Sequence, residues 1–150
     1  MSLDENKALA KRLYVEVFGA GNMGAADEIL APDCVSHAAD APPVIGPDQI
    51  KRQAFVLRGA IPDLVSTLED QVAEGDRVAS RWIGSGTNTG PLMLPSGVIP
   101  ATGKAIRFGE LRIDRFANGH IVESWFIPDR LALWQQLGIL PTPAPPPEAG

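Results

Sequence analysis

The 150 residues are enough for one domain with a real core, and 45% hydrophobic with 21% charged residues is a globular composition. A net charge of −5 disfavours binding to nucleic-acid phosphates, which requires clustered lysine and arginine. Cys34 is the only cysteine and His37 and His120 are the only histidines, so we expect no internal disulfide and no metal centre built on cysteine or on a histidine cluster. No apolar run approaches the length of a membrane span and no signal peptide is recognisable, so we expect a cytoplasmic protein.

Helical patterns fill the first third of the chain. Ser2 and Glu5 have the spacing of a capping box, which predicts a helix that begins there and stops at the glycines of 19–21. Asn22 is a suitable N-cap for a second, short helix. The Gly-Pro-Asp sequence at 46–48 predicts a third helix, because proline and an acidic residue favour the first turn.

After residue 62 the pattern changes to the period of two that is typical of strands. Strands are predicted over 64–74, 77–89, 104–117 and 120–127. Asn118-Gly119 predicts a tight hairpin between the last two strands, and a short helix is expected over 130–137. The Pro/Gly-rich segment 90–103 is expected to be a loop.

Helices followed by hairpin-linked strands predict an α+β domain over residues 1–140, with N-terminal helices packed on a curved antiparallel sheet. A strongly curved sheet covered by helices leaves a conical cavity, where a small-molecule ligand would bind. Residues 141–150 are Pro-rich and are expected to form a disordered tail.

The segment 19–24 matches the G-x-G-x-x-G pattern of nucleotide-binding proteins. That pattern requires a preceding buried strand and later crossover helices, whereas helical periodicity precedes it here and tight hairpins follow. We therefore interpret it as a connection between two helices and expect no nucleotide cofactor.

Asp129 has two possible roles. It follows Trp125-Phe126-Ile127-Pro128 at the end of the last strand, and apolar surroundings would raise the pKa of its carboxyl toward a range useful for a general base. It also immediately precedes the helix expected from Arg130, where it would be an N-cap.

The hairpin register bears on this choice. If Asn118-Gly119 is a two-residue turn, Asp114 faces Glu123 and Arg112 faces Trp125. The opposite face then carries residues suited to the core, namely Leu111, Ile113, Val122 and Phe126. Strict alternation directs Asp129 away from that face, and a bulge or break at Pro128 would be needed to turn it inward. In the first hairpin, Arg81 is expected to pair with Asp70.

His37 lies between a helix and a Pro-rich loop, in an extended piece over 34–37. It would polarise a carbonyl group or return a proton to an enolate. The alternative is a histidine that only hydrogen-bonds to nearby backbone.

Several segments, taken in order, resemble the SnoaL-like polyketide cyclases, also called ester cyclases, of the nuclear transport factor 2-like superfamily. They are 31–37, 62–64, 74–79, 81–90, 101–104, 115–125, Asp129 and 135–138. The resemblance implies a cone-shaped, cystatin-like α+β barrel fold, usually as a homodimer or homotetramer, without metal or organic cofactor. It also implies ring closure of a polyketide by intramolecular aldol condensation, with Asp129 as the base and His37 in the pocket.

Two features depart from this family. Its members often have histidine where this chain has Asn88, which cannot exchange a proton, and the loop 91–100 is longer than expected. We predict an aldol-type cyclase, or a related proton-abstracting enzyme, for a hydrophobic carbonyl-bearing small molecule. Four further residues are expected to line its pocket: Tyr14, Phe55, Asn88 and Trp125. The alternatives are a non-catalytic small-molecule-binding module and an isomerase or hydrolase of the same superfamily.

Overall fold

A long, curved sheet organises the computed structural model, which describes residues 1–141. Its strands are β1 (Leu30–Ala38), β2 (Val44–Ile45), β3 (Val65–Glu74), β4 (Arg77–Thr87), β7 (Ala105–Ala117) and β8 (His120–Pro128). They lie in the order β2-β1-β8-β7-β4-β3, and all neighbours are antiparallel except β1 and β8, which run parallel. The α+β class is confirmed. Of the tail expected to be disordered, all but Pro141 lies outside the described residues.

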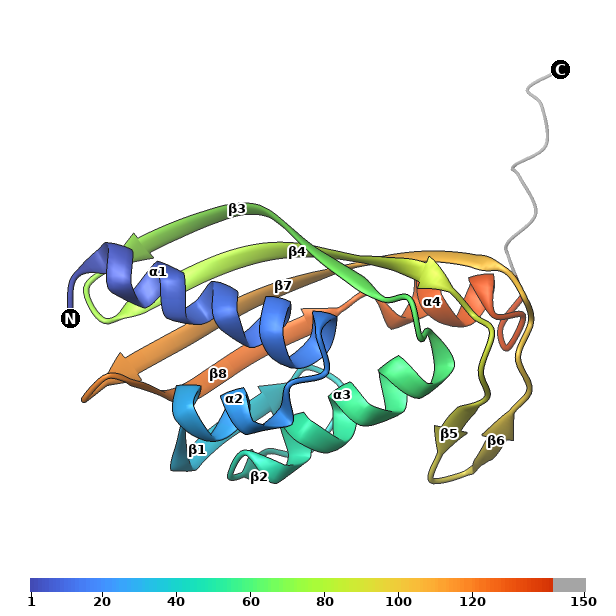
Figure 1. The fold of residues 1–150 in the computed structure, drawn as a ribbon, viewed down its shortest axis with the longest axis horizontal. Coiled ribbons are helices and arrows are strands. Elements are labelled where there is room, and N and C mark those ends of the chain that lie inside the picture. The colour runs from blue at the N-terminus through green and yellow to red at the C-terminus, as the bar shows by residue number, and fades with distance from the viewer. Residues whose placement is uncertain (142–150) are drawn as a thin grey trace, which may run out of the picture.

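Helices cover one face of this sheet (Figure 1). They are α1 (Leu3–Arg12), the π-helical segment η1 (Leu13–Gly19), α2 (Met23–Ile29) and α3 (Asp48–Ala60). The capping box is present, since the Ser2 hydroxyl accepts from the Glu5 amide and the Glu5 carboxylate from the Ser2 amide. Asn22 caps α2 as predicted. The G-x-G-x-x-G segment joins η1 to α2, so a helix precedes it and the nucleotide-binding context is absent.

The core lies between these helices and the inner face of the sheet. Trp82 of β4 is 2% exposed, and its ring stacks on Tyr14 with centroids 4.2 Å apart. Aliphatic side chains surround this pair, including Leu13, Val17 and Ile29, each 0% exposed. Burying one such side chain stabilises a fold by roughly 1.5–3 kcal/mol, so this cluster fixes the helices on the sheet.

The predicted register of the last hairpin is correct next to the turn, where Ala117 faces His120, and is wrong by one residue from Arg115 onward. A bulge beside Arg115 shifts the ladder, so that Asp114 faces Ser124 and Arg112 faces Phe126. A one-residue shift of one strand exchanges the faces of its side chains. The extra residue, Val122, lies on β8, whereas β7 alternates without interruption. Its inner, buried face carries Arg112 and Asp114, and Leu111 and Ile113, expected in the core, lie on the outer face at 57% and 41% exposed. The predicted pairing of Asp70 with Arg81 is confirmed at 2.7 Å.

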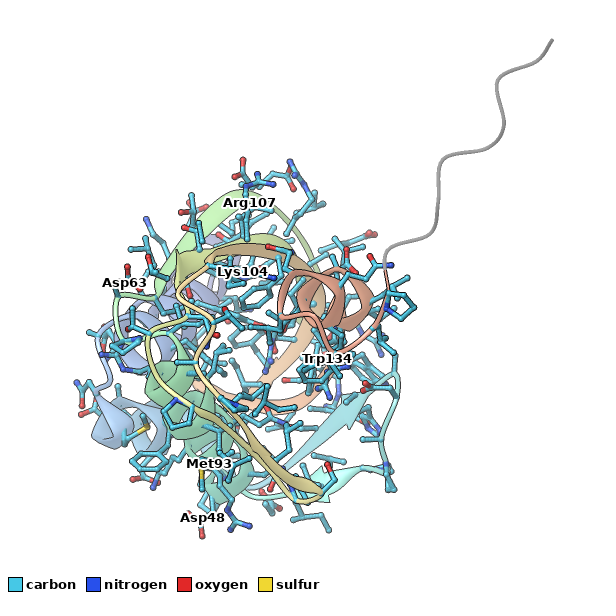
Figure 2. All side chains as sticks on the ribbon, turned by 90° about the vertical axis from the view of Figure 1, so that its right-hand side faces the viewer. Asp48, Asp63, Met93, Lys104, Arg107 and Trp134 are labelled. Carbon is cyan, nitrogen blue, oxygen red and sulfur yellow. The ribbon has the colours of Figure 1, made fainter. Side chains whose placement is uncertain are left out.

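The far end of the sheet is closed by α4 (Arg130–Gln136) and by a small hairpin of β5 (Leu92–Leu94) and β6 (Gly97–Ile99). This hairpin lies within the segment expected to be a loop. A second cluster of buried residues joins these parts to the sheet: Ala60, Ile61, Leu64, Leu92, Ile106, Leu133 and Leu137. Figure 2 looks onto this end, where Trp134 of α4 and Met93 of the hairpin lie around the side chains of the interior. Within residues 1–141, no helix is long and apolar enough to span a membrane.

Candidate functional site

A groove of about 620 Å³ lies on the outer side of the sheet, where β4, β7 and β8 reach α4. Apolar side chains form most of its wall, among them Ala39, Ile83, Leu111, Ile127 and Leu131. Charged residues are spaced around it: Asp40, Arg81, Asp129 and Arg130. An apolar groove with a few polar groups has the composition of a small-molecule site.

Asp129 lies in this groove because β8 ends beside it. Its amide still donates to the Gly109 carbonyl at 2.8 Å, and the chain then turns into α4. The Asp129 Oδ1 accepts a hydrogen bond from the Ala132 amide at 3.0 Å, which confirms the predicted N-cap. The residue is exposed rather than enclosed by apolar walls. Its role as a base stays a prediction.

A smaller groove of about 380 Å³ adjoins the first and shares Arg81, Leu111 and Ile127 with it. Trp125 and Val72 belong to this second groove. The two grooves thus form one continuous, largely apolar surface on the outside of the sheet, with Trp125 toward one end and Asp129 at the other.

His37 lies beside this surface, with its ring stacked on Trp125 at a centroid distance of 5.4 Å. Its Nε2 is 2.9 Å from Glu123 Oε1, and Arg115 donates to the other Glu123 oxygen at 3.0 Å. The His37 and Arg115 hydrogen bonds lower the pKa of Glu123. His37 lines neither of the two grooves described, so the geometry gives no contact between His37 and Asp129.

Three of the predicted pocket residues line neither of the two grooves. Tyr14 is in the core, 6% exposed, and Phe55 is on the outside of α3, 73% exposed. Asn88 is 1% exposed; its amide nitrogen donates to the carbonyls of Ala60 and Gly90, and its Oδ1 accepts from Thr102 twice. These four hydrogen bonds use the full capacity of the Asn88 amide, which therefore anchors the loop after β4.

Glu110, which sequence reasoning did not single out, lies on the inner face of β7, and the residue as a whole is half-buried. Its Oε1 is sealed from solvent and has no hydrogen-bond partner among residues 1–141. Burial raises the pKa of this carboxyl to about 7, against the opposing effect of Arg112. The groove that contains Asp129 borders this stretch of β7 on the face of the sheet opposite to the Glu110 side chain. The period-two pattern places Glu110 on the same face of β7 as Arg112. The opposite face, with Leu111 and Ile113, was expected from the sequence to be the core face.

Arg112 and Asp114 form a buried ion pair next to Glu110. Arg112 Nε donates to Asp114 Oδ1 at 2.6 Å, and both side chains are 1% exposed. Ser124 ties them together, because it accepts from Arg112 Nη2 at 2.8 Å and donates to Asp114 Oδ1 at 2.6 Å. The guanidinium also lies over the rings of Tyr14 and Phe126, at 5.6 and 5.2 Å. Such a pair is fixed in place by its neighbours.

The sequence profile of the SnoaL-like polyketide cyclases matches residues 8–137. This chain belongs to that family. No curated protein matches the sequence. The structure of this SnoaL-like protein is similar to that of IdmH from Streptomyces antibioticus, provisionally assigned as a polyketide cyclase, with a TM-score of 0.73 and 29% identity over 89% of this chain and 98% of that one.

Two further structures extend the comparison. AclR from Streptomyces galilaeus, provisionally assigned as a hydroxylase, has a TM-score of 0.81 and 26% identity over 95% of this chain and 87% of that one. A provisionally assigned SnoaL-like polyketide cyclase from Jannaschia sp. CCS1 has a TM-score of 0.79 and 24% identity over 92% of this chain and 94% of that one. The fold is thus shared by proteins that carry different assigned activities, and the reaction has to be argued from the site.

Proposed function

We propose that this SnoaL-like protein closes a ring in a hydrophobic carbonyl compound by an aldol-type reaction, with Asp129 as the base. The observation that carries this proposal is a carboxylate at the edge of a largely apolar groove in a chain of the SnoaL-like polyketide cyclase family. An apolar wall holds the body of such a substrate, and holding two carbon centres close together supplies much of the rate of an intramolecular condensation.

The chemistry assigned to Asp129 is removal of a proton from the carbon next to a carbonyl group. Its Oδ1 is engaged with the start of α4, which fixes the position of the carboxyl at the end of β8. A base in a fixed position needs little reorganisation before it accepts a proton. His37 is kept as a polar partner in this proposal, as the family resemblance implies, and would act from the Trp125 end of the surface.

Proton abstraction can be tested without knowledge of the natural substrate. In D₂O, a slowly exchanging aromatic ketone such as 1-tetralone takes up deuterium at its α-carbon when a base removes the α-proton. The wild-type protein is expected to speed this exchange, as followed by proton NMR. Asp129→Asn is expected to abolish the effect while α4 remains folded, because asparagine caps a helix as well as aspartate does.

The matched control is Asp48→Asn, at another helix start and 82% exposed in its side chain, which should exchange at the wild-type rate. An unchanged rate in Asp129→Asn would contradict the assignment of the base. If the wild-type protein binds 1-tetralone, as judged by saturation-transfer NMR, but exchanges none of it, the non-catalytic binding module becomes the better description.

We also propose that the chain is a homodimer that pairs through the outer face of the sheet. Val72, Leu111, Ile113 and Ile127 are 41–69% exposed there and belong to one surface. Contiguous apolar surface of this kind marks interaction sites. A second copy would also cover the open groove beside Asp129. Sedimentation velocity of the wild type and of Ile113→Glu tests this homodimer, and a monomeric wild type would contradict it.

A cytoplasmic location is our further proposal, to be tested by cell fractionation.

A further inference from the structure

The outer face of the sheet carries rows of side chains that run across the strands in register. The middle row is apolar and consists of Val72, Ala79, Ile113 and Trp125. The row on one side of it is charged: Glu74, Arg77, Arg115 and Glu123. The row on the other side is charged on β3 and β4 and apolar on β7 and β8: Asp70, Arg81, Leu111 and Ile127. An apolar strip with charged margins has the composition of a protein interface.

A second copy of this chain fits the symmetry of this surface. Of the five long strands of the sheet, in the order β1-β8-β7-β4-β3, β7 lies in the middle. Sheets that pack face to face keep their strands nearly aligned. A two-fold axis between two copies then lies in the plane of contact and runs either along the strands or across them. An axis over β7 places Ile113 opposite its own copy and lets each of the five strands face a strand of the partner.

An axis along β7 brings β8 of one copy against β4 of the other. Trp125 then lies opposite the partner's Ala79, so a large side chain meets a small one. Glu123 lies opposite the partner's Arg77, and the Arg77 side chain is 57% exposed. Glu123 Oε1, which is hydrogen-bonded to His37, has a second lone pair for this arginine. Shape and charge therefore match in this arrangement.

An axis across the strands through the same point gives a poorer match. Trp125 then meets its own copy, so that bulk opposes bulk. The charged rows meet with like signs, because Arg77 lies opposite the partner's Arg81 and Glu74 opposite the partner's Asp70. Like charges placed together disfavour an interface. The surface therefore favours the axis along β7.

The axis along β7 also determines what covers Asp129. The Asp129 amide donates to the Gly109 carbonyl, and Gly109 pairs with Ile83 of β4. These residues form the next row of the outer face and line the groove of about 620 Å³. With β8 against the partner's β4, the partner's Ile83 lies opposite Asp129. An apolar side chain there excludes water from the carboxylate, and a carboxylate that has lost its hydration binds a proton more strongly.

We infer that the site of the base is completed across the dimer: two copies pack through their outer sheet faces about an axis along β7, and the partner's Ile83 covers Asp129. This inference rests on the homodimer and the reaction proposed above. Asp129, which is exposed in a single chain, acquires in this way the apolar surroundings that favour a general base.

The axis is tested by exchanging charges between two chains. Arg77→Glu and Glu123→Arg each place like charges opposite one another, so each variant alone is expected to sediment as a monomer. An equimolar mixture restores opposite charges at both contacts of a mixed dimer and should sediment as a dimer. Arg52→Glu, at an exposed position of α3, is the control and should stay dimeric. Circular dichroism checks that all three variants are folded. A dimeric Arg77→Glu, or a mixture that stays monomeric, would overturn the axis.

The cover over Asp129 is tested by combining two impaired chains. Ile83→Thr keeps a β-branched side chain but admits water, and its rate in the 1-tetralone exchange assay should fall by about 10-fold or more. Asp129→Asn lacks the base. When the two variants are co-expressed in equal amounts, a mixed dimer joins an intact Asp129 to an intact Ile83 of the partner. Since half of the dimers are mixed and each has one complete site, the mixture should reach about one quarter of the wild-type rate.

The outcomes separate this inference from the proposed reaction. A mixture that exchanges no faster than the mean of its two variants would overturn the cover across the dimer, because Ile83 would then act within its own chain. A wild-type rate in Ile83→Thr would overturn the cover as well. If the charge exchange behaves as expected but the wild-type dimer exchanges no 1-tetralone, the proposed reaction is overturned and the interface stands.

Discussion

The two faces of β7 invert the usual distribution of polar and apolar residues. The inner face buries Arg112 and Asp114 and half-buries Glu110, whereas the outer face exposes Leu111 and Ile113. A monomeric domain normally does the reverse, because charged groups lose hydration when they are buried and apolar groups gain free energy. Each face therefore carries a feature that stability of the isolated fold does not explain.

The explanation differs between the faces. The polar inner side chains are held by a buried ion pair, and Glu110 Oε1 and Asp114 Oδ2 have no hydrogen-bond partner among residues 1–141. The apolar outer side chains form one surface across two shallow grooves, as expected of a face that another molecule covers. Four tests show how far this contrast holds, from the largest expected effect to the smallest.

The largest effect is expected from Arg112→Ala, which leaves the Asp114 carboxylate buried without its partner. Loss of one member of a buried ion pair costs about 3–5 kcal/mol of unfolding free energy. The control on the outer face of the same strand is Arg115→Ala, whose pair with Glu123 is 33% and 25% exposed. That change should cost at most about 1 kcal/mol. Urea unfolding measures both, and equal losses would remove the distinction between the faces.

A second test concerns the pH dependence of stability through Glu110. Its pKa in the folded protein, about 7, lies above the value of 4.5 for a free glutamate. Stabilisation by this group is therefore complete below pH 4.5 and is lost as the pH rises to about 7. The loss is at most about 3 kcal/mol. Glu110→Gln should lack this slope and be the more stable protein above neutral pH, as measured by urea unfolding at a series of pH values. Parallel slopes in the two proteins would mean that Glu110 is not shielded from water.

The helices and long strands could be predicted because their signals are local. The capping box at Ser2, the Asn22 cap and the Asn118-Gly119 turn act over a few residues, and each lies where it was expected. The second helix ends at Ile29, and β1 begins at Leu30. Pairing of β1 with β8, far along the chain, outweighs local helix propensity here.

The faces of β7 could not be predicted, because hydrophobicity favours burying Leu111 and Ile113, whereas the side chains that are buried are the charged Arg112 and Asp114. The bulge at Val122 of β8 could not be predicted either, because nothing in the residue types at that point requires it.

Glu110 was missed because it lies on that same inner face of β7, and the candidate pocket residues Tyr14, Phe55 and Asn88 come from η1, α3 and the segment after β4. Their separation in space reflects long-range packing that a single sequence does not encode in any short pattern.

A third, smaller effect separates the two roles of Asp129. Asp129→Ala removes both the carboxylate and the cap of α4, and loss of an N-cap costs about 1 kcal/mol. Asp129→Asn removes only the charge and should unfold within about 0.5 kcal/mol of the wild type. Thermal unfolding of both variants measures the difference. Equal stability of Asp129→Ala and wild type would show that the hydrogen bond to Ala132 contributes nothing to α4.

The smallest effect is expected from Leu111→Ala on the outer face, because a side chain that is 57% exposed has little burial to lose. For the monomer the cost should be within about 0.5 kcal/mol. If a second copy covers this face, however, dissociation is part of unfolding and stability depends on protein concentration. Leu111→Ala should then be almost silent in dilute protein and increasingly destabilising, relative to wild type, as concentration rises. Unfolding curves at a series of concentrations measure this, and a small effect independent of concentration would mean that the exposed apolar face meets water rather than a second subunit.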